Sequence, residues 1–347
     1  MGLARQDVAP IINLLKVITL QIRLQRMTTY AVSLEDIRAA YERIKPMVHR
    51  TPVLTCSTLD ALAGRAIFLK CENLQKVGAF KFRGACNAVA QLEPDMASRG
   101  VVTHSSGNHA QALALAARMR GIPAYIVMPR TAPGVKRRAV EGYGGKVFPC
   151  EPNLAAREAE ANRVLQETGA TMIPPYDHPH VVAGQGTIAL EILEQVPQLD
   201  ALIAPVGGGG LMSGLCIAAH GLNPKLRVFA GEPAGADDAA RSKAAGKLLP
   251  QTGPNTIADG LLTSLGQLTW PIIRDHVERI ITVSDEAIIA AMRLVWERAK
   301  IIIEPSSAVP VAAVLSDEFK ALKGIDRIGV VLSGGNVDLD ALPWRKS

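Results

Sequence analysis

Residues 201–213 read ALIAPVGGGGLMS, an apolar run followed by four glycines that lead into a helical segment. Continuous apolar strands of this kind are typical of parallel sheets that helices cover on both faces. A tight turn needs fewer glycines, and four in succession lose much chain entropy on folding. Their backbone N–H groups can instead close around an anion at a helix N-terminus, so Gly207 to Gly210 predict a phosphate cradle.

The same alternation of short apolar runs and amphipathic segments extends along the chain from Ser33, which is a typical N-cap with acids following it. It predicts an α/β fold with parallel sheets flanked by helices. Two sheets would share one body with a cleft between them, and ligands would lie beyond the carboxyl ends of the strands. The expected strands are 66–69, 101–103, 124–127, 146–148, 201–204, 227–230, 279–282 and 327–332, and the expected helices include 110–118, 155–167, 187–194 and 285–300.

Composition excludes several classes of protein. The chain has 347 residues, 48% of them hydrophobic and 20% charged, which is enough for two cores and excludes intrinsic disorder. Lys and Arg number 38 against 32 Asp and Glu, and this net charge of +6 is too small for a nucleic-acid-binding surface. No apolar run is long enough to cross a membrane. The nearly balanced charge favours a small-molecule partner. The five scattered cysteines contain no C-x-x-C pair, which favours reduced thiols in a cytoplasmic protein.

Residues 1–29 form a basic leader with four basic residues against one acid, so half of the net charge of +6 lies there. Two interpretations are open. The leader is a disordered or dispensable extension, or it is an organelle targeting peptide. Its charged residues are Arg5, Asp7, Lys16, Arg23 and Arg26.

Two other polar segments follow expected strands, as the glycine run does. Residues 105–109 read SSGNH and residues 333–336 read SGGN. Since the carboxyl ends of parallel strands meet at one edge of a sheet, we expect these segments to line the ligand site.

Lys81 lies in the segment GAFKFRG, residues 78–84. Taken alone, it is best interpreted as a solvated lysine. Together with a phosphate cradle it favours pyridoxal phosphate, which offers an aldehyde to a lysine and a phosphate to glycines. A nucleotide P-loop is excluded because no Gly-Lys-Ser/Thr follows the glycines, and a dinucleotide G-x-G-x-x-G motif would end on Met212 or Ser213.

The motifs GAFKFRG, SSGNHAQ, PVGGGGL and LSGGNVD together resemble the serine racemase and serine/threonine dehydratase family. These are fold type II pyridoxal-phosphate enzymes, similar to the β subunit of tryptophan synthase, and the likeness runs from about Ser33 to Trp344. The resemblance implies an active site in the cleft between two domains. The large domain would comprise residues 30–99 and 178–347, with a small domain inserted at 100–177.

The resemblance also implies roles for single residues. Lys81 would form a Schiff base with the cofactor and move the substrate Cα proton, while Ser333 would face the pyridine nitrogen. The cofactor would be held by Lys81, Phe80, Asn108, Gly207, Gly208, Gly209, Gly210 and Ser333, and the substrate carboxylate by Ser105, Ser106, Asn108 and His109.

Ser106 bears on the type of reaction. Racemisation needs a proton donor on the face opposite Lys81, whereas loss of water needs only Lys81 and departure of the β-hydroxyl. Many plain dehydratases of the family carry Ala where Ser106 stands, so this serine permits racemisation without proving it. The resemblance implies interconversion of L- and D-serine with dehydration of serine to pyruvate and ammonia. The alternative is a dehydratase only, acting on L-threonine, L-serine or threo-3-hydroxyaspartate, and an intact Lys81 argues against a silent cofactor carrier.

Residues 232–238 read EPAGADD. Taken alone, the segment is an exposed acidic turn. The resemblance implies a divalent-cation site there, in which Glu232, the Ala236 carbonyl and Asp238 bind Mg²⁺, Ca²⁺ or Mn²⁺ as a structural or activating ion.

Two positions depart from the mammalian serine racemases, which carry Asn and Ser where this chain has Tyr176 and Thr263. The segment around Tyr176 resembles the bacterial 3-hydroxyaspartate dehydratases instead. The sequence therefore leaves three substrates open for the pocket that would hold the β-substituent, namely serine, threonine and hydroxyaspartate. Lys300 and Gln111 match residues near a nucleotide-effector site of the mammalian enzymes. The family likeness also implies a homodimer.

Overall fold

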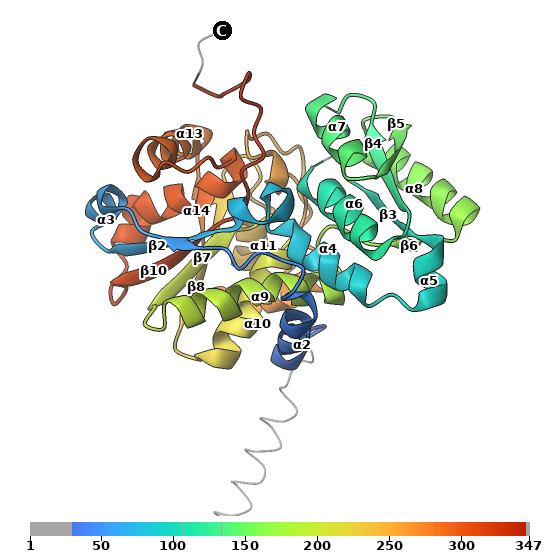
Figure 1. Cartoon of the computed structure of the whole chain (residues 1–347). Coiled ribbons are helices and arrows are strands. Elements are labelled where there is room, and N and C mark those ends of the chain that lie inside the picture. The colour runs from blue at the N-terminus through green and yellow to red at the C-terminus, as the bar shows by residue number, and fades with distance from the viewer. Residues whose placement is uncertain (1–29, 106, 133, 345–347) are drawn as a thin grey trace, which may run out of the picture. The chain divides into compact units, whose positions relative to one another are not determined.

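The computed structural model describes residues 30–105, 107–132 and 134–344, and the described residues from Val32 onward belong to one compact unit (Figure 1). The predictions for the leader and for Ser106 therefore lie outside the described residues. None of the described helices has both the length and the apolar character that a membrane-spanning helix needs.

The larger sheet has six strands in the order β1-β2-β10-β7-β8-β9. Neighbouring strands are parallel except β1 with β2, which are antiparallel. Arg327 of β10 pairs with Ala66 of β2, so the sheet joins segments far apart in the chain. The strands are β1 Val53–Leu54, β2 Ala66–Cys71, β7 Ala201–Pro205, β8 Arg227–Pro233, β9 Arg279–Val283 and β10 Arg327–Leu332.

The smaller sheet has four parallel strands in the order β5-β4-β3-β6. All of them come from one continuous stretch of chain, and their helices lie together beside them (Figure 1). The strands are β3 Val101–His104, β4 Ala124–Pro129, β5 Lys146–Cys150 and β6 Thr171–Met172, and the helices are α6 Asn108–Arg120, α7 Gly134–Gly142 and α8 Leu154–Thr168.

Helices cover both faces of the larger sheet (Figure 1). α9 (Pro179–Gln195) and α10 (Gly210–Leu222) lie on one face, and α13 (Asp285–Leu294) and α14 (Pro305–Leu315) lie on the other. Because both faces are covered, every residue of β7 is buried. The other helices are α2 Leu34–Ile44, α3 Ser57–Ala63, α4 Lys81–Ala90, α5 Pro94–Arg99, α11 Asp238–Ala245, α12 Thr269–His276 and α15 Asp317–Lys320, with short turns η1 Glu72–Leu74, η2 Lys76–Gly78, η3 Asp259–Leu261 and η4 Val295–Ala299.

The predicted α/β class is confirmed, and each expected strand lies within an observed one. The N-cap at Ser33 is confirmed too, because its hydroxyl accepts the Asp36 N–H at 3.1 Å. The expected helix 285–300 is wrong at its end. α13 stops at Leu294, a π-helical turn follows, and Lys300 takes φ 60. The apolar periodicity continues through that turn, so the sequence does not reveal it.

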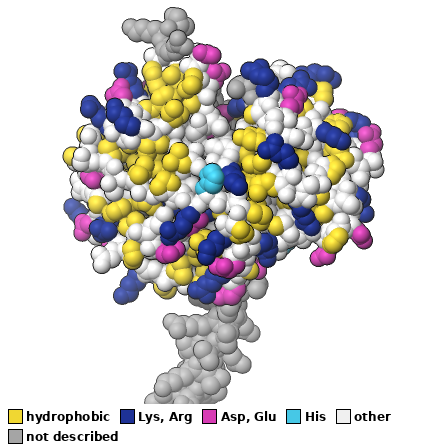
Figure 2. Space-filling view, viewed as in Figure 1, with side chains coloured by type: hydrophobic (Ala, Val, Ile, Leu, Met, Phe, Trp, Pro, Cys, Tyr) yellow, Lys and Arg dark blue, Asp and Glu magenta, His cyan; other side chains and the backbone are white. Residues whose placement is uncertain are grey.

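The face of the molecule shown in Figure 2 carries Lys and Arg side chains interspersed with Asp, Glu and apolar side chains. The charges of both signs are mixed on this face.

Candidate active site

Lys81 is the first residue of α4, and Phe80 before it already has helical φ and ψ. The Lys81 Nζ donates to the Pro175 carbonyl at 2.7 Å and lies 5.1 Å from the centre of the Phe80 ring. Burial lowers the pKa of Lys81 to about 8, against the opposing effect of the Glu304 carboxylate. The interpretation of a freely solvated lysine is therefore wrong, because this amine is bonded to the Pro175 carbonyl within the fold and its pKa is lowered.

The glycine run follows β7 and opens α10, as the sequence predicts. Gly209 has φ 88, and a Cβ there would lie 2.7 Å from Thr269 Oγ1. All four glycines are buried. No hydrogen bond joins the N–H groups of Gly207, Gly208 or Gly209 to another described residue. Buried N–H donors at the start of a helix are suited to a phosphate group.

Residues 175–177 connect Lys81 to the glycine run. Beyond the bond from Lys81 to Pro175, the Tyr176 ring lies so close to Gly208 that a Cβ on that glycine would be 2.3 Å from it. Asp177 accepts N–H groups at the start of α12, including that of Leu268 at 2.9 Å. The segment therefore fixes the distance between the lysine and the cradle.

The loops 105–109 and 333–336 also meet. Asn108, the first residue of α6, accepts a hydrogen bond from the Asn336 amide at 2.9 Å. The Phe80 N–H donates to the Ser333 carbonyl at 3.0 Å, which ties the start of α4 to the second loop. The segments that the sequence singled out thus converge on one place.

His109 lies in α6 with its side chain turned inward, where Nε2 bonds the Ile173 carbonyl at 2.9 Å. Burial and the nearby Lys81 lower the pKa of His109 to about 3, so it is neutral. Its backbone N–H, at the opening of the helix, remains suited to a carboxylate. Ser105 Oγ accepts the Gly107 N–H at 3.4 Å.

Glu304 is a site residue that the sequence did not reveal. It precedes α14 and is 5% exposed, and it accepts Asn108 Nδ2 at 2.9 Å and the Asn336 N–H at 3.1 Å. Burial and the Asp259 carboxylate raise the pKa of Glu304 to about 7. Only one signal in the sequence could have found it, namely an acid placed directly after the apolar run 301–303.

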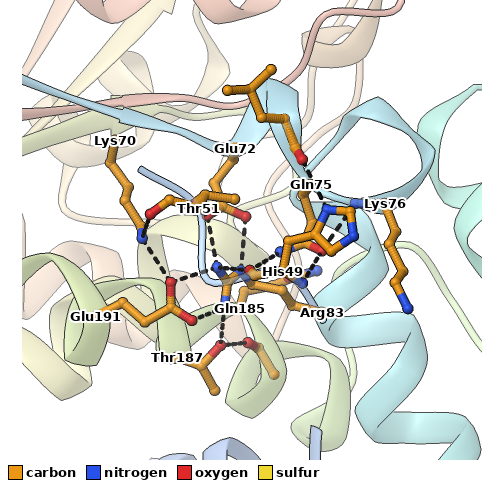
Figure 3. A network of polar contacts seen from close by, with 12 residues as sticks. His49, Thr51, Lys70, Glu72, Gln75, Lys76, Arg83, Gln185, Thr187 and Glu191 are labelled. Carbon is orange, nitrogen blue, oxygen red and sulfur yellow. Dashed lines mark hydrogen bonds and ion pairs between the residues drawn. The ribbon is translucent and has the colours of Figure 1, made fainter. Parts of the chain in front are cut away.

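Arg83, two residues after Lys81, was likewise not singled out from the sequence. It lies at the centre of a buried ionic network (Figure 3). It forms paired hydrogen bonds with Glu72 at 2.7 and 2.8 Å and with Glu191 at 2.8 Å. Lys70 Nζ donates to Glu191 at 2.6 Å. The two cations and two carboxylates balance, and they join α4 to η1, β2 and α9.

The segment 232–238 is not an exposed turn at its acids, since Glu232 and Asp238 are fully buried. Glu232 accepts the N–H groups of Ala239 and Ala240 at 2.9 and 2.8 Å. Asp238 Oδ1 is buried without a hydrogen-bond partner among the described residues. Burial raises the pKa of Glu232 to about 8 and raises the pKa of Asp238 as well. A divalent cation bound between these two buried acids would favour their ionised forms and would lower both pKa values. The described residues contain no cluster of three or more His, Cys, Asp and Glu side chains placed for a metal.

Tyr176 and Thr263 are the two positions that depart from the mammalian racemases. Burial raises the pKa of the Tyr176 phenol, against the opposing effect of the Thr263 side chain. The Tyr176 side chain lies against Gly208 and Gly210 of the glycine run.

Comparison with known proteins agrees with this geometry. The model of the pyridoxal-phosphate dependent enzyme family matches residues 44–334. The serine racemase of Arabidopsis thaliana is 54% identical, covering 90% of this chain and 96% of its own length. The beta-hydroxyaspartate dehydratase of Paracoccus denitrificans is 51% identical, covering 91% and 99%. The solved structure of maize serine racemase superposes with a TM-score of 0.89 at 51% identity, covering 90% and 95%. This chain belongs to the pyridoxal-phosphate dependent enzyme family.

Proposed function

We propose that the enzyme interconverts L- and D-serine and also dehydrates serine to pyruvate and ammonia. The observation that carries this proposal is the convergence of Lys81, the glycine run and the loops 105–109 and 333–336 on one site. The likeness to serine racemases over nine-tenths of the chain supports it.

The residues present fit pyridoxal phosphate. Gly207 to Gly210 would hold its phosphate through buried N–H donors, Asn108 its ring hydroxyl and Ser333 its pyridine nitrogen, with Phe80 and Lys81 beside it. When bound, the cofactor withdraws electrons from the substrate Cα, which makes the proton there removable.

Lys81 is the base in this proposal. With its pKa lowered to about 8 by burial, a useful fraction of its amine is neutral near physiological pH and can accept the Cα proton. The opening of α6, with Ser105, Asn108 and the His109 N–H, would orient the substrate carboxylate. The β-hydroxyl then leaves with a proton as water, and hydrolysis of the released enamine by a second water gives pyruvate and ammonia.

Ser106 is the proposed proton donor on the opposite face of the substrate. Return of a proton by Lys81 regenerates the starting enantiomer, and delivery by Ser106 gives the other one. The proposal of racemisation therefore depends on this residue.

The second candidate is a dehydratase without racemase activity, with threo-3-hydroxyaspartate, L-threonine or L-serine as substrate. The pair Tyr176 and Thr263 favours it, since both residues differ from the mammalian racemases and the beta-hydroxyaspartate dehydratase of Paracoccus denitrificans is 51% identical.

Product analysis separates the two. The purified enzyme, supplied with Mg²⁺, is given L-serine, L-threonine and L-threo-3-hydroxyaspartate separately, and D-amino acid and keto acid are quantified. D-serine together with pyruvate supports the first candidate. Keto acid alone supports the second, with the fastest substrate naming the enzyme, and no turnover contradicts both.

The remaining proposals concern organisation. We propose that residues 100–177 form a small inserted domain. We also propose that the enzyme is a cytoplasmic homodimer with a nucleotide effector near Gln111 and Lys300. Glu232, the Ala236 carbonyl and Asp238 are proposed to bind Mg²⁺, Ca²⁺ or Mn²⁺. The cation proposal is supported by the buried acids, and addition of Mg²⁺ should raise the thermal midpoint of the wild type but not of Glu232→Gln.

A further inference from the structure

Val77 is held in a strained backbone conformation beside the active site. It has φ 57 and ψ 14 and is 6% exposed. The left-handed region is costly for a β-branched residue, and such strain is retained where the surrounding structure enforces it. The consequence here is the direction of the Val77 carbonyl, which accepts the Asn336 side-chain amide at 2.7 Å.

This carbonyl determines the orientation of two amides in succession. Because a carbonyl only accepts, the NH₂ group of Asn336 must face Val77. The same NH₂ group lies 2.9 Å from the Asn108 amide, so that contact must be with the Asn108 oxygen. The Asn108 NH₂ group is thereby turned to Glu304, whose carboxylate oxygens lie at 2.9 and 3.1 Å.

Glu304 closes this chain of hydrogen bonds from the other end. It also accepts the Asn336 N–H at 3.1 Å, and it packs against Gly334, where a Cβ would lie 2.6 Å from Oε1. Asn336 and Glu304 thus fix the orientation of the Asn108 amide, whose NH₂ group carries two hydrogens and can donate both to Glu304 and to a ligand. A reversed amide would turn its oxygen toward Glu304 and its NH₂ group toward that of Asn336.

We propose that Asn336 and Glu304 are positioning residues that hold Asn108 as a hydrogen-bond donor toward the ring hydroxyl of pyridoxal phosphate, with the strained Val77 carbonyl setting the direction. This inference rests on the proposed role of Asn108 in binding the cofactor. It assigns a function to Asn336, which the sequence motif contains but does not explain.

The direct test is Asn336→Asp, which keeps the shape of the side chain and removes its donor. Equilibrium dialysis of the holoenzyme measures the dissociation constant of pyridoxal phosphate. The absorption spectrum of the bound cofactor is recorded as well, and both measurements are made without substrate. The dissociation constant should rise by about tenfold or more, as for loss of a buried hydrogen bond, and the absorption maximum should shift. An affinity and spectrum equal to the wild type would overturn the proposal.

Asn87→Asp is the matched control. Asn87 is buried and also donates to a backbone carbonyl at 2.7 Å, that of His180, but it lies outside this chain of hydrogen bonds. The Asp variant loses this donor but keeps an acceptor for Arg43, and it should leave cofactor affinity and spectrum unchanged. If it changes both as strongly as Asn336→Asp does, the effect is merely structural and the positioning role is refuted.

Glu304→Gln decides the question if the Asp variant does not fold. The charged groups that act on Glu304 are Lys81 from α4, Asp259 from η3 and Lys136 from α7. Ionised Glu304 only accepts, which favours one orientation of Asn108, whereas glutamine can match either. The affinity advantage of the wild type over this variant should therefore grow as the pH rises through about 7, the pKa to which burial raises Glu304. A constant ratio would contradict the proposal.

These outcomes are distinct from failure of the proposed function. A wild type that binds the cofactor but converts no substrate contradicts the racemase and dehydratase proposals and leaves the positioning role to these measurements. A wild type that binds no pyridoxal phosphate contradicts both.

Discussion

Lys81 experiences two opposing influences, since burial favours its neutral amine and the Glu304 carboxylate favours the charged form. Burial is the stronger, and the pKa falls to about 8. Lys81→Ala should lower turnover by roughly a thousandfold, the effect of losing a positioned base, and should abolish the yellow absorbance of the lysine-bound cofactor. Spectra and initial rates check this, with Lys76→Ala as the control that keeps both. Survival of the yellow species would show that another lysine binds the cofactor.

Ser106 separates two outcomes of one proton removal. Ser106→Ala should abolish formation of D-serine from L-serine while pyruvate formation continues, because water loss needs no donor on the second face. Chiral chromatography and a keto-acid assay on the same sample measure both products. Equal loss of the two products would contradict the opposite-face role and indicate that Ser106 serves substrate binding.

At the scale of elements, Arg83 holds α4 against η1 and α9 through two buried carboxylates. Arg83→Met leaves Glu72 and Glu191 with only Lys70 for compensation, and breaking a buried ion pair in this way costs about 3–5 kcal/mol. The free energy of unfolding in urea should fall by that amount. Arg83→Lys should recover only part of the lost free energy of unfolding. Lysine restores the positive charge, but it cannot form paired hydrogen bonds with both carboxylates.

The exposed pairs of Arg163 with Glu160 and Glu167 provide the comparison. Arg163→Met should leave the urea midpoint unchanged, since solvent screens such pairs. If Arg163→Met lowered stability in urea as much as Arg83→Met does, burial would not be the reason that the Arg83 network stabilises the fold.

The elements were largely predictable from sequence where the pattern is strong. Continuous apolar runs identified the long strands, whereas β1 and β6 are two residues each and too short to show any pattern. The Ser33 cap was readable because its partner Asp36 is local. The π-helical turn after Leu294 was not, because it keeps the apolar spacing of the helix before it.

The site was predictable only where a residue type is unusual in itself. Lys81 and the glycine run belong to motifs, and these motifs singled them out as candidates. Glu304 and Asn336 act through partners that lie far away in the chain, Asn108 and Val77, and no local spacing reveals such a pairing. The orientation of an amide depends on the fold as a whole.

At the scale of the whole molecule, stability in acid should depend on His109. Burial depresses its folded-state pKa to about 3, below the ordinary value of 6.5, so the unfolded chain binds its proton first. The neutral ring therefore contributes stability above about pH 6.5 that is lost as the pH falls toward 3. The free energy of unfolding should decline across this range by at most about 1.4 kcal/mol per pH unit for this one group.

His109→Gln keeps a donor for the Ile173 carbonyl but cannot take up a proton. Its free energy of unfolding should decline less steeply than that of the wild type between about pH 6.5 and pH 4, measured by urea titration at each pH. Parallel curves would show that the imidazole is not the group that titrates.

The pairing of Arg327 with Ala66 has a consequence for how the protein is made. β10 is a central strand of the larger sheet, yet among the strands of the described residues it is made after all the others. The smaller sheet, built from one continuous stretch, can fold during synthesis. β2 and β7, which flank β10, must each wait with an unpaired edge until it joins them. The nascent chain therefore exposes unpaired, aggregation-prone strand edges for most of its synthesis. The yield of folded protein in cells should accordingly depend on chaperones, although the native unit is compact.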